Sequence, residues 1–127
     1  MRVGVDAVDV DRFRKAIHRT PRLVERVFTD GERAYCEPAR DPTERFAVRW
    51  AAKEAAMKVL GAGIGEVRFR DVEVVRAAAG RPSLVLHDGA AQRADELGLD
   101  AWDVSLTHSG LVAIAVVVGV ASSPTGG

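Results

Sequence analysis

The feature that most constrains the fold is a long run of helix-forming residues that ends at a glycine. Residues 43–60 are rich in Ala, Arg, Glu, Lys and Met, all of which have high helix propensities. Gly61 follows directly, and glycine often ends a helix in the left-handed conformation. The sequence therefore predicts one long helix over residues 43–60.

Shorter segments with other patterns flank this helix. Strands are predicted where β-branched and apolar residues concentrate, at residues 2–6, 71–75, 83–87, 102–108 and 111–118. Further helices are predicted at 8–17, at 29–36 behind a Thr29-x-x-Glu32 capping box, and at 88–97 with Asp88 as N-cap and Gly98 beyond the end. Helices first and strands later predict an α+β domain, with an antiparallel sheet packed against the long helix.

Length and composition indicate a single soluble domain. The chain has 127 residues, which fits one domain over residues 1–121 and a flexible tail at 122–127. Cys36 is the only cysteine, so we expect no intrachain disulfide, a reducing cytoplasmic location and a small buried side chain. The apolar run at 111–118 is too short to span a bilayer, and the residues before Asp6 contain no apolar signal core. A net charge of zero argues against a general nucleic-acid binder.

Positive charge gathers between residues 12 and 26. Six cations face a single acid, Glu25, in this segment: Arg12, Arg14, Lys15, Arg19, Arg22 and Arg26. A solvated helix face explains such a cluster on its own. The functional alternative is a docking patch for an acidic partner, because complementary charge steers encounter and selects partners.

Two carboxylates that are far apart in the sequence are candidate metal ligands. Asp6 closes the first predicted strand, and Glu54 lies within the long helix. Taken separately, Asp6 has the place of a capping residue, and Glu54 that of a surface residue paired with Lys58. Together they are two hard oxygen ligands, which magnesium uses alongside substrate phosphates and water. Calcium would need more oxygens, and zinc would need a His or Cys pair at ligand spacing.

Several cations on the long helix have the spacing to contact a phosphate. Lys58 lies one turn beyond Glu54. Arg49 and Lys53 are also four residues apart, on a neighbouring stripe that Arg45 continues. Solvation at the helix surface is the simpler interpretation of Arg45 and Arg49, although a guanidinium is well suited to phosphate.

Glycines and a histidine complete the set of candidate residues. Gly61, Gly63 and Gly65 have backbone amides that could meet an anion, but a glycine-rich helix end explains them nearly as well. His108 ends a predicted strand, where a hydrogen-bonded structural histidine is commoner than a base. No convincing set of nucleophile, histidine and acid can be assembled from the sequence.

Several of these residues belong to a pattern found in a known family. The matching blocks cover nearly the whole chain before the tail: Gly4-Val-Asp6, Val27-Phe-Thr-Asp-Gly-Glu32, Phe46 to Ala55 with Lys58, Gly80-Arg-Pro82 and Val104 to Ser109. In their order and spacing, the chain resembles the holo-[acyl-carrier-protein] synthases, which are small stand-alone 4′-phosphopantetheinyl transferases.

The resemblance implies transfer of the 4′-phosphopantetheine arm of coenzyme A to a serine of an acyl carrier protein. It implies that Asp6 and Glu54 hold Mg²⁺ and that Glu54 and Lys58 serve catalysis. Arg12, Arg19 and Arg22 match positions that grip the acidic carrier protein. The residues expected to contact coenzyme A are Arg49, Lys58, Gly61, Gly63 and His108.

The resemblance also implies a homotrimer with active sites between neighbouring subunits. In such a trimer, the metal pair and the basic helix that face one substrate can come from different chains. The general base stays open between a water molecule on the metal, Glu54 itself and a carboxylate of the carrier protein.

Three positions depart from the family pattern, and two other functions remain as alternatives. Arg2 replaces a common glycine, Ala62 replaces a threonine and Arg81 replaces a lysine. The first alternative is a module that binds carrier proteins or nucleotides without turnover. The second is a metal-dependent hydrolase of pyrophosphates, which would need a dedicated base to activate water.

Overall fold

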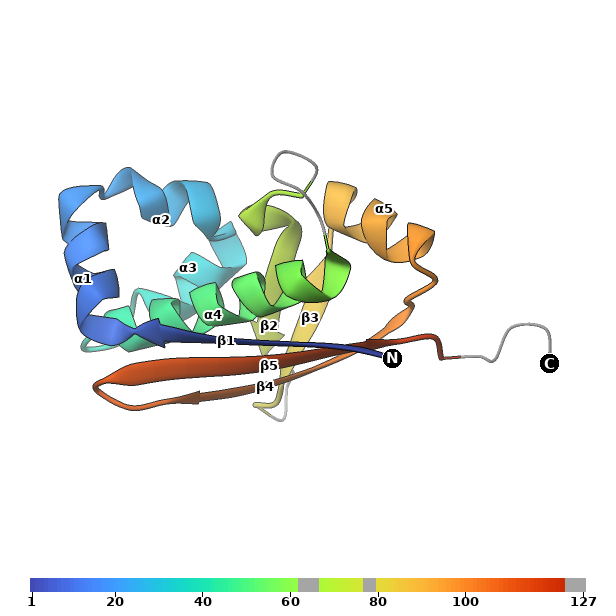
Figure 1. Cartoon of the computed structure of the whole chain (residues 1–127). Helices are drawn as coiled ribbons and strands as arrows, with labels where there is room; N and C mark the ends of the chain where they lie inside the picture. The colour runs from blue at the N-terminus through green and yellow to red at the C-terminus, as the bar shows by residue number, and fades with distance from the viewer. Residues whose placement is uncertain (62–66, 77–79, 123–127) are drawn as a thin grey trace.

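In a computed structural model of the chain, which describes residues 1–61, 67–76 and 80–122, helices cover one face of an antiparallel sheet (Figure 1). The N-terminal half contains β1 (Arg2–Asp9), α1 (Val10–Arg19), α2 (Arg22–Val27), α3 (Asp30–Cys36) and α4 (Thr43–Leu60). The C-terminal half contains a 3₁₀ turn η1 (Phe69–Asp71), β2 (Val72–Arg76), β3 (Pro82–Leu86), α5 (Asp88–Glu96), β4 (Ala101–His108) and β5 (Val112–Val120). The predicted α+β class is confirmed.

The five strands divide into two antiparallel sheets rather than one. The larger sheet has the order β1-β5-β4, and β2 pairs only with β3. The last strand, β5, therefore lies in the centre, with Asp6 of β1 and Leu106 of β4 on either side of Ala115. The first and last strands of the domain meet here, so the N-terminal Asp6 is held by the C-terminal part of the chain.

Small side chains line the contact between α4 and this sheet. On α4, five alanines are fully buried: Ala47, Ala51, Ala52, Ala55 and Ala56. On β5, Ala113 and Ala115 are also fully buried, because alternate residues of a strand face the same side. Figure 1 shows α4 lying along the sheet from end to end. Helix and sheet thus approach closely, which sets the distance between their side chains.

Most predicted element types are confirmed, and several ends differ. The helix at 43–60 is confirmed, with Gly61 in the left-handed conformation at φ 59°. The capping box is confirmed, because Thr29 Oγ1 accepts from the Glu32 N–H at 3.1 Å and Glu32 Oε1 accepts from the Thr29 N–H at 2.9 Å. The first strand extends to Asp9, whose carboxylate caps α1.

Two predictions about chain ends are wrong. The N-cap of α5 is His87, not Asp88, which itself adopts an unusual φ of 43°. The predicted tail includes Ser122, yet the carboxylate of Asp100 accepts hydrogen bonds from the Ser122 N–H at 2.6 Å and hydroxyl at 2.8 Å. The rest of the predicted tail, 123–127, lies outside the described residues.

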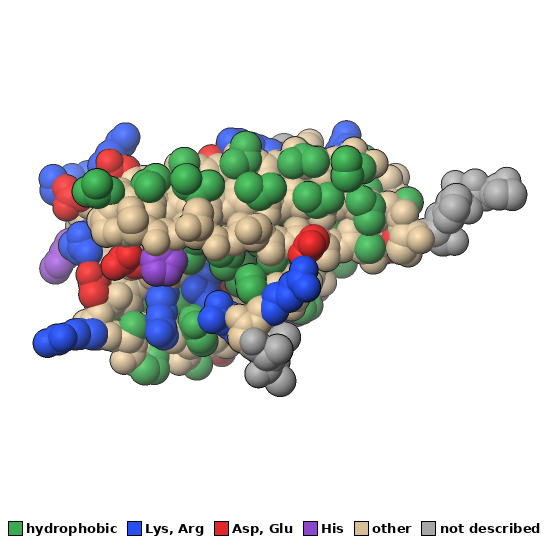
Figure 2. Space-filling model, turned by 90° about the horizontal axis from the view of Figure 1, so that it is seen from below, with side chains coloured by type: hydrophobic (Ala, Val, Ile, Leu, Met, Phe, Trp, Pro, Cys, Tyr) green, Lys and Arg blue, Asp and Glu red, His purple; other side chains and the backbone are tan. Residues whose placement is uncertain are grey.

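The outer face of the larger sheet carries apolar side chains that no other described element covers. Val3 and Val5 are 57% and 53% exposed, and Ile114, Val116 and Val118 lie opposite Ala7, Val5 and Val3 in the register. Figure 2 shows these hydrophobic side chains as rows along the face. An apolar stripe of this kind is typical of a surface that binds another protein.

None of the helices that the structure describes combines the length and the apolar content needed to cross a bilayer. Cys36 is fully buried, as predicted, and burial raises the pKa of its thiol to about 11.

A buried ion pair ties α4 to the rest of the helical layer. Lys53 and Glu32 are both essentially inaccessible to solvent, and Lys53 Nζ lies 2.7 Å from Glu32 Oε1. The same ammonium donates to the carbonyls of Phe69 at 3.0 Å and of Val72, so all three protons have acceptors. Burial lowers the pKa of Lys53, and the Glu32 charge acts in the opposite direction. The stripe of Arg49 and Lys53 is therefore an interior feature, not a solvated one.

We expect Lys53→Met to lower the free energy of unfolding by about 3–5 kcal/mol, because it leaves the Glu32 carboxylate buried without its partner. Urea denaturation measures this change, with Lys15→Met on the exposed face of α1 as the control. An unfolding free energy equal to that of the wild type would contradict the assigned role of the pair.

Candidate active site

Asp6 and Glu54 meet in one pocket between β1, α1 and α4. The pocket holds about 380 Å³, and both carboxylates line it together with Arg12 and Trp50. Asp6 faces α4 because it lies on the same side of β1 as the buried Gly4. Glu54 projects from α4 toward this edge of the sheet. The predicted convergence of the two carboxylates is thus present within a single chain.

The two carboxylates lie close enough to perturb each other. The pKa of Glu54 is raised, first by partial burial and then by the negative charge of Asp6, while Trp50 and Lys58 act in the opposite direction. Like charges held together disfavour full ionisation, and a bound cation removes that penalty. The arrangement therefore favours a positively charged ligand between Asp6 and Glu54.

Lys58 pairs with Asp6 rather than with Glu54. Its Nζ lies 3.0 Å from Asp6 Oδ1 and 3.0 Å from the carbonyl oxygen of Val5. Among the described residues no Glu54–Lys58 ion pair forms, so the surface salt bridge that helix spacing allowed is absent. The Lys58 side chain is 56% exposed and has a third proton, which leaves it able to meet an anion at the mouth of the pocket.

The donor set at the pocket fits magnesium. Within residues 1–61, 67–76 and 80–122, no group of three or more His, Cys, Asp or Glu side chains is arranged to hold a metal ion. Zinc and calcium sites built only from protein ligands need such groups. Two carboxylate oxygens are what magnesium takes from a protein when phosphates and water complete its coordination.

Arg49 lies in a second pocket, away from Asp6 and Glu54. The guanidinium groups of Arg45, Arg49 and Arg76 lie 4.7, 4.4 and 5.3 Å from the centre of the Tyr35 ring. Arg49 is only 3% exposed, and its Nε has no hydrogen-bond partner in the described structure. Three guanidiniums with an unsatisfied N–H form a strong anion site. Sequence reasoning missed Tyr35 and Arg76, because no spacing pattern relates them to Arg49.

His108 and the glycines are not gathered around the carboxylate pair. His108 ends β4, with β5 between it and β1, and its Nδ1 lies 3.0 Å from Glu44 Oε1 at the start of α4. Gly61 caps the far end of α4 through its N–H, which donates to Met57 O at 2.9 Å. Gly63 lies outside the described residues, as does Ala62.

The other two departures from the family pattern have structural partners. Arg2 Nη1 donates to the carbonyl of Val59 at 2.7 Å and so caps the end of α4, where a cation is favourable. Arg81 Nη2 lies 3.6 Å from Asp103 Oδ1, across two exposed side chains. Arg2 thus adds a second tie between β1 and α4.

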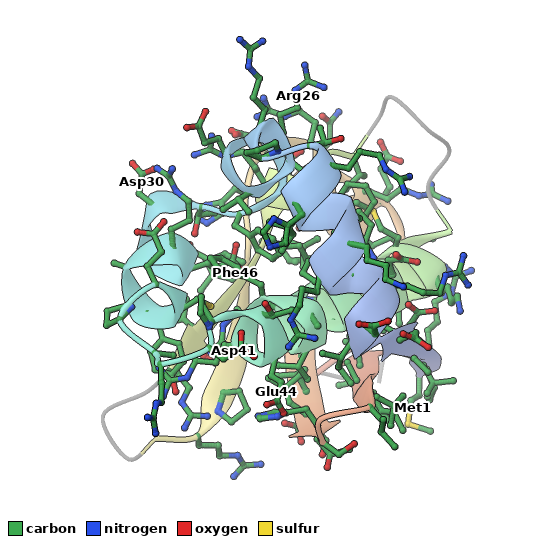
Figure 3. The ribbon with its side chains drawn as sticks, turned by 90° about the vertical axis from the view of Figure 1, so that its left-hand side faces the viewer. Met1, Arg26, Asp30, Asp41, Glu44 and Phe46 are labelled. Carbon is green, nitrogen blue, oxygen red and sulfur yellow. The ribbon has the colours of Figure 1, made fainter. Side chains whose placement is uncertain are left out.

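The basic segment forms a surface beside the carboxylate pocket. Arg12, Arg19 and Arg22 are exposed, and none of them has an ion-pair partner among the described residues. Arg14, in contrast, is engaged by Asp41 at 2.7 Å. Figure 3 looks onto this side of the molecule, with Arg26 projecting into solvent. Arg12 lines the carboxylate pocket of its own chain, so basic helix and metal pair need not come from different subunits.

Comparison with known proteins identifies the family. A profile of the 4′-phosphopantetheinyl transferase superfamily matches residues 2–116. A holo-[acyl-carrier-protein] synthase of Frankia alni is 51% identical over 116 residues, 91% of this chain and 93% of that protein. One of Moorella thermoacetica is 43% identical over 118 residues, 93% of this chain and 92% of that protein. The Helicobacter pylori holo-[acyl-carrier-protein] synthase, solved in complex with coenzyme A, superposes with a TM-score of 0.81 at 29% identity, covering 93% and 99% of the two chains. The chain therefore belongs to the 4′-phosphopantetheinyl transferase superfamily.

Proposed function

We propose that this chain is a magnesium-dependent holo-[acyl-carrier-protein] synthase. It transfers the 4′-phosphopantetheine arm of coenzyme A to a serine of an apo acyl carrier protein and releases adenosine 3′,5′-bisphosphate. Relatives of this name match nearly the whole chain. The observation that carries the mechanism is the meeting of Asp6 and Glu54 in one pocket beside exposed arginines.

Each residue of the pocket has a part in phosphoryl transfer. Asp6 and Glu54 hold Mg²⁺, which neutralises charge on the diphosphate and makes the phosphorus a better electrophile. Lys58 donates to a phosphate oxygen with the proton that Asp6 and Val5 leave free. Phosphoryl transfer depends mainly on positioning and charge stabilisation, so this set suffices without a strong base.

The arginine cluster on Tyr35 supplies a second anion site. Coenzyme A carries a 3′-phosphate in addition to its diphosphate, and Arg49 presents an unsatisfied N–H to a pocket of about 220 Å³. Arg45 and Arg76 add positive charge at the same ring. The cluster is the part of this chain that binds the 3′-phosphate.

The exposed face of the sheet supports a homotrimer with active sites between subunits. Within one chain, His108 and Arg49 lie away from the pocket of Asp6 and Glu54. A coenzyme A molecule that touches both groups of residues is therefore bound by two subunits. Burial of the apolar stripe that includes Val5 and Val116 provides the free energy for such an assembly.

The exposed arginines of α1 and α2 form the docking surface for the carrier protein. Arg12, Arg19 and Arg22 are free of ion pairs in the described structure and attract an acidic partner at long range. Arg12 also lines the pocket. A carrier protein bound here brings its serine to the phosphorus held at Asp6 and Glu54.

A mass measurement separates transfer from the alternatives. The chain is incubated with Mg²⁺, coenzyme A and an apo carrier protein, and the carrier is weighed by mass spectrometry. Transfer adds the mass of one phosphopantetheine arm. Release of the bisphosphate without a heavier carrier would indicate a hydrolase, and no change in either molecule would indicate a binding module.

Glu54→Gln should abolish transfer and leave the fold intact. At neutral pH without metal, its melting temperature should equal or exceed that of the wild type, because the raised pKa of Glu54 means that its charged form is disfavoured in the native state. Transfer assays and thermal melts measure both effects, with Glu96→Gln on α5 as the control. A variant that keeps its turnover rate would show that Glu54 is misassigned.

The same shift predicts how activity depends on pH. Glu54 must be ionised to hold the cation, and its pKa lies above the ordinary value of about 4.3. Activity should therefore fall as the pH drops through this raised pKa, and higher Mg²⁺ concentration should move the fall to lower pH. A pH–rate profile at two Mg²⁺ concentrations measures the shift, and coincident acid limbs would contradict it.

Reversal of charge on the basic surface should weaken carrier binding. Arg19→Glu with Arg22→Glu should raise KM for the carrier about tenfold or more at low salt and leave KM for coenzyme A unchanged, because complementary charge acts on encounter. Added salt should reduce the difference. Gln92→Glu on α5 is the control for added negative charge, and an unchanged KM in the double variant would refute the docking surface.

A further inference from the structure

Gly4 lies where β1 and α4 approach most closely. A Cβ atom placed on Gly4 would lie 2.1 Å from the carbonyl oxygen of Ala55 and 3.1 Å from Val59 Cγ2. Cβ atoms in proteins essentially never come within 3.0 Å of another heavy atom. Any side chain at position 4 therefore forces the strand and the helix apart.

This contact is adjacent to both carboxylates of the pocket. Gly4 and Asp6 are alternate residues of β1, so both face α4. Ala55 directly follows Glu54 on α4. A separation of the backbones at Gly4 and Ala55 is therefore passed on to Asp6 and Glu54.

The strand, not the helix, is the element able to move. β1 is an edge strand that pairs only with β5, and its outer face carries exposed Val3 and Val5. Helix α4 is held by the buried Lys53–Glu32 pair and by its alanine contacts with β5. A larger residue at position 4 thus tilts β1 away while the core of the domain stays together.

We infer that Gly4 is a positioning residue whose missing side chain sets the spacing of the metal ligands Asp6 and Glu54. The inference rests on the proposed role of this pair. Lys58 works in the same direction, because it bridges Val5 O and Asp6 on the strand from its place on the helix. The glycine permits the approach, and the lysine holds the strand in it.

The test measures cation binding without turnover. Binding of Mn²⁺ alone to the full chain is followed by electron paramagnetic resonance, as a probe of the magnesium site. Gly4→Ala should weaken Mn²⁺ binding about tenfold or more and raise the Mg²⁺ concentration for half-maximal transfer by a similar factor. KM for the carrier protein should not change, because α1 and α2 keep their surface.

A second substitution tests spacing rather than general damage. Asp6→Glu adds one methylene, which reaches across the wider gap in the Gly4→Ala background. The double variant should bind Mn²⁺ more tightly than Gly4→Ala alone, whereas Asp6→Glu alone should bind it more weakly than the wild type. Absence of this rescue would overturn the inference.

Gly119→Ala is the matched control at the same interface. Its Cβ would lie 3.0 Å from the Trp102 ring and 3.2 Å from Val59 Cγ1, which are side-chain atoms able to yield, and Gly119 lies opposite Arg2, away from Asp6. This variant should lower the melting temperature and leave Mn²⁺ binding unchanged.

The outcomes separate this inference from the proposed function. If the wild type does not bind Mn²⁺, the metal role of Asp6 and Glu54 fails first. If the wild type binds and Gly4→Ala binds equally well, the positioning role of Gly4 is overturned. Gly4→Ala is also made with Val59→Ala, which gives the strand room. If neither variant folds, Gly4 is a requirement for folding, and the inference is likewise overturned.

Discussion

The close packing of α4 on β1 and β5 is the contact on which the rest of the structure depends. Alanines on the helix and on β5, and Gly4 on β1, remove the side-chain layer that normally separates a helix from a sheet. Interiors are packed as densely as organic crystals, so this distance is a rigid property of the domain. The carboxylates of Asp6 and Glu54 are carried on the two elements that meet, and they inherit their spacing from it.

The angular orientation of α4 has a separate origin. Lys53 and Glu54 are consecutive, so their side chains leave the helix about 100° apart. Lys53 is fully buried against Glu32 and the carbonyls before β2, which directs Glu54 toward β1 and the pocket. A buried charge pair is costly to form and costly to break, so it resists rotation of the helix. Structure and chemistry are thus carried by neighbouring residues of one motif.

Charge is arranged around the pocket in a way that suits an anionic substrate and an acidic partner. The Asp6–Glu54 pair is electrostatically frustrated until a cation enters, while Lys58 and Arg12 stand at the same pocket. Fixed charges that need no rearrangement when negative charge develops are the main source of catalysis in many enzymes. The arginines around Tyr35 and the exposed face of the sheet extend this arrangement beyond one subunit.

Local features of the chain were predictable because they depend on neighbours in sequence. The helix ending at Gly61 and the capping box at Thr29 follow from propensity and from contacts three or four residues apart. The Asp88 cap was predicted wrongly, since the preceding strand brings His87 to that place instead. Asp6, Glu54 and Lys58 were recognised from residue chemistry and from the resemblance to the family.

The partners of the charged residues were decided only by the tertiary structure. Helix spacing offered Lys58 to Glu54, but packing of β1 beside α4 gave it to Asp6. The same spacing left Lys53 and Arg49 on the surface, whereas α3 and β2 cover them. Sequence alone determined which segments are helices and which side chains carry charge, because these properties are local. Which charges meet, and which are buried, depended on elements far apart in the chain, because burial and ion pairing are set by what packs across from each residue.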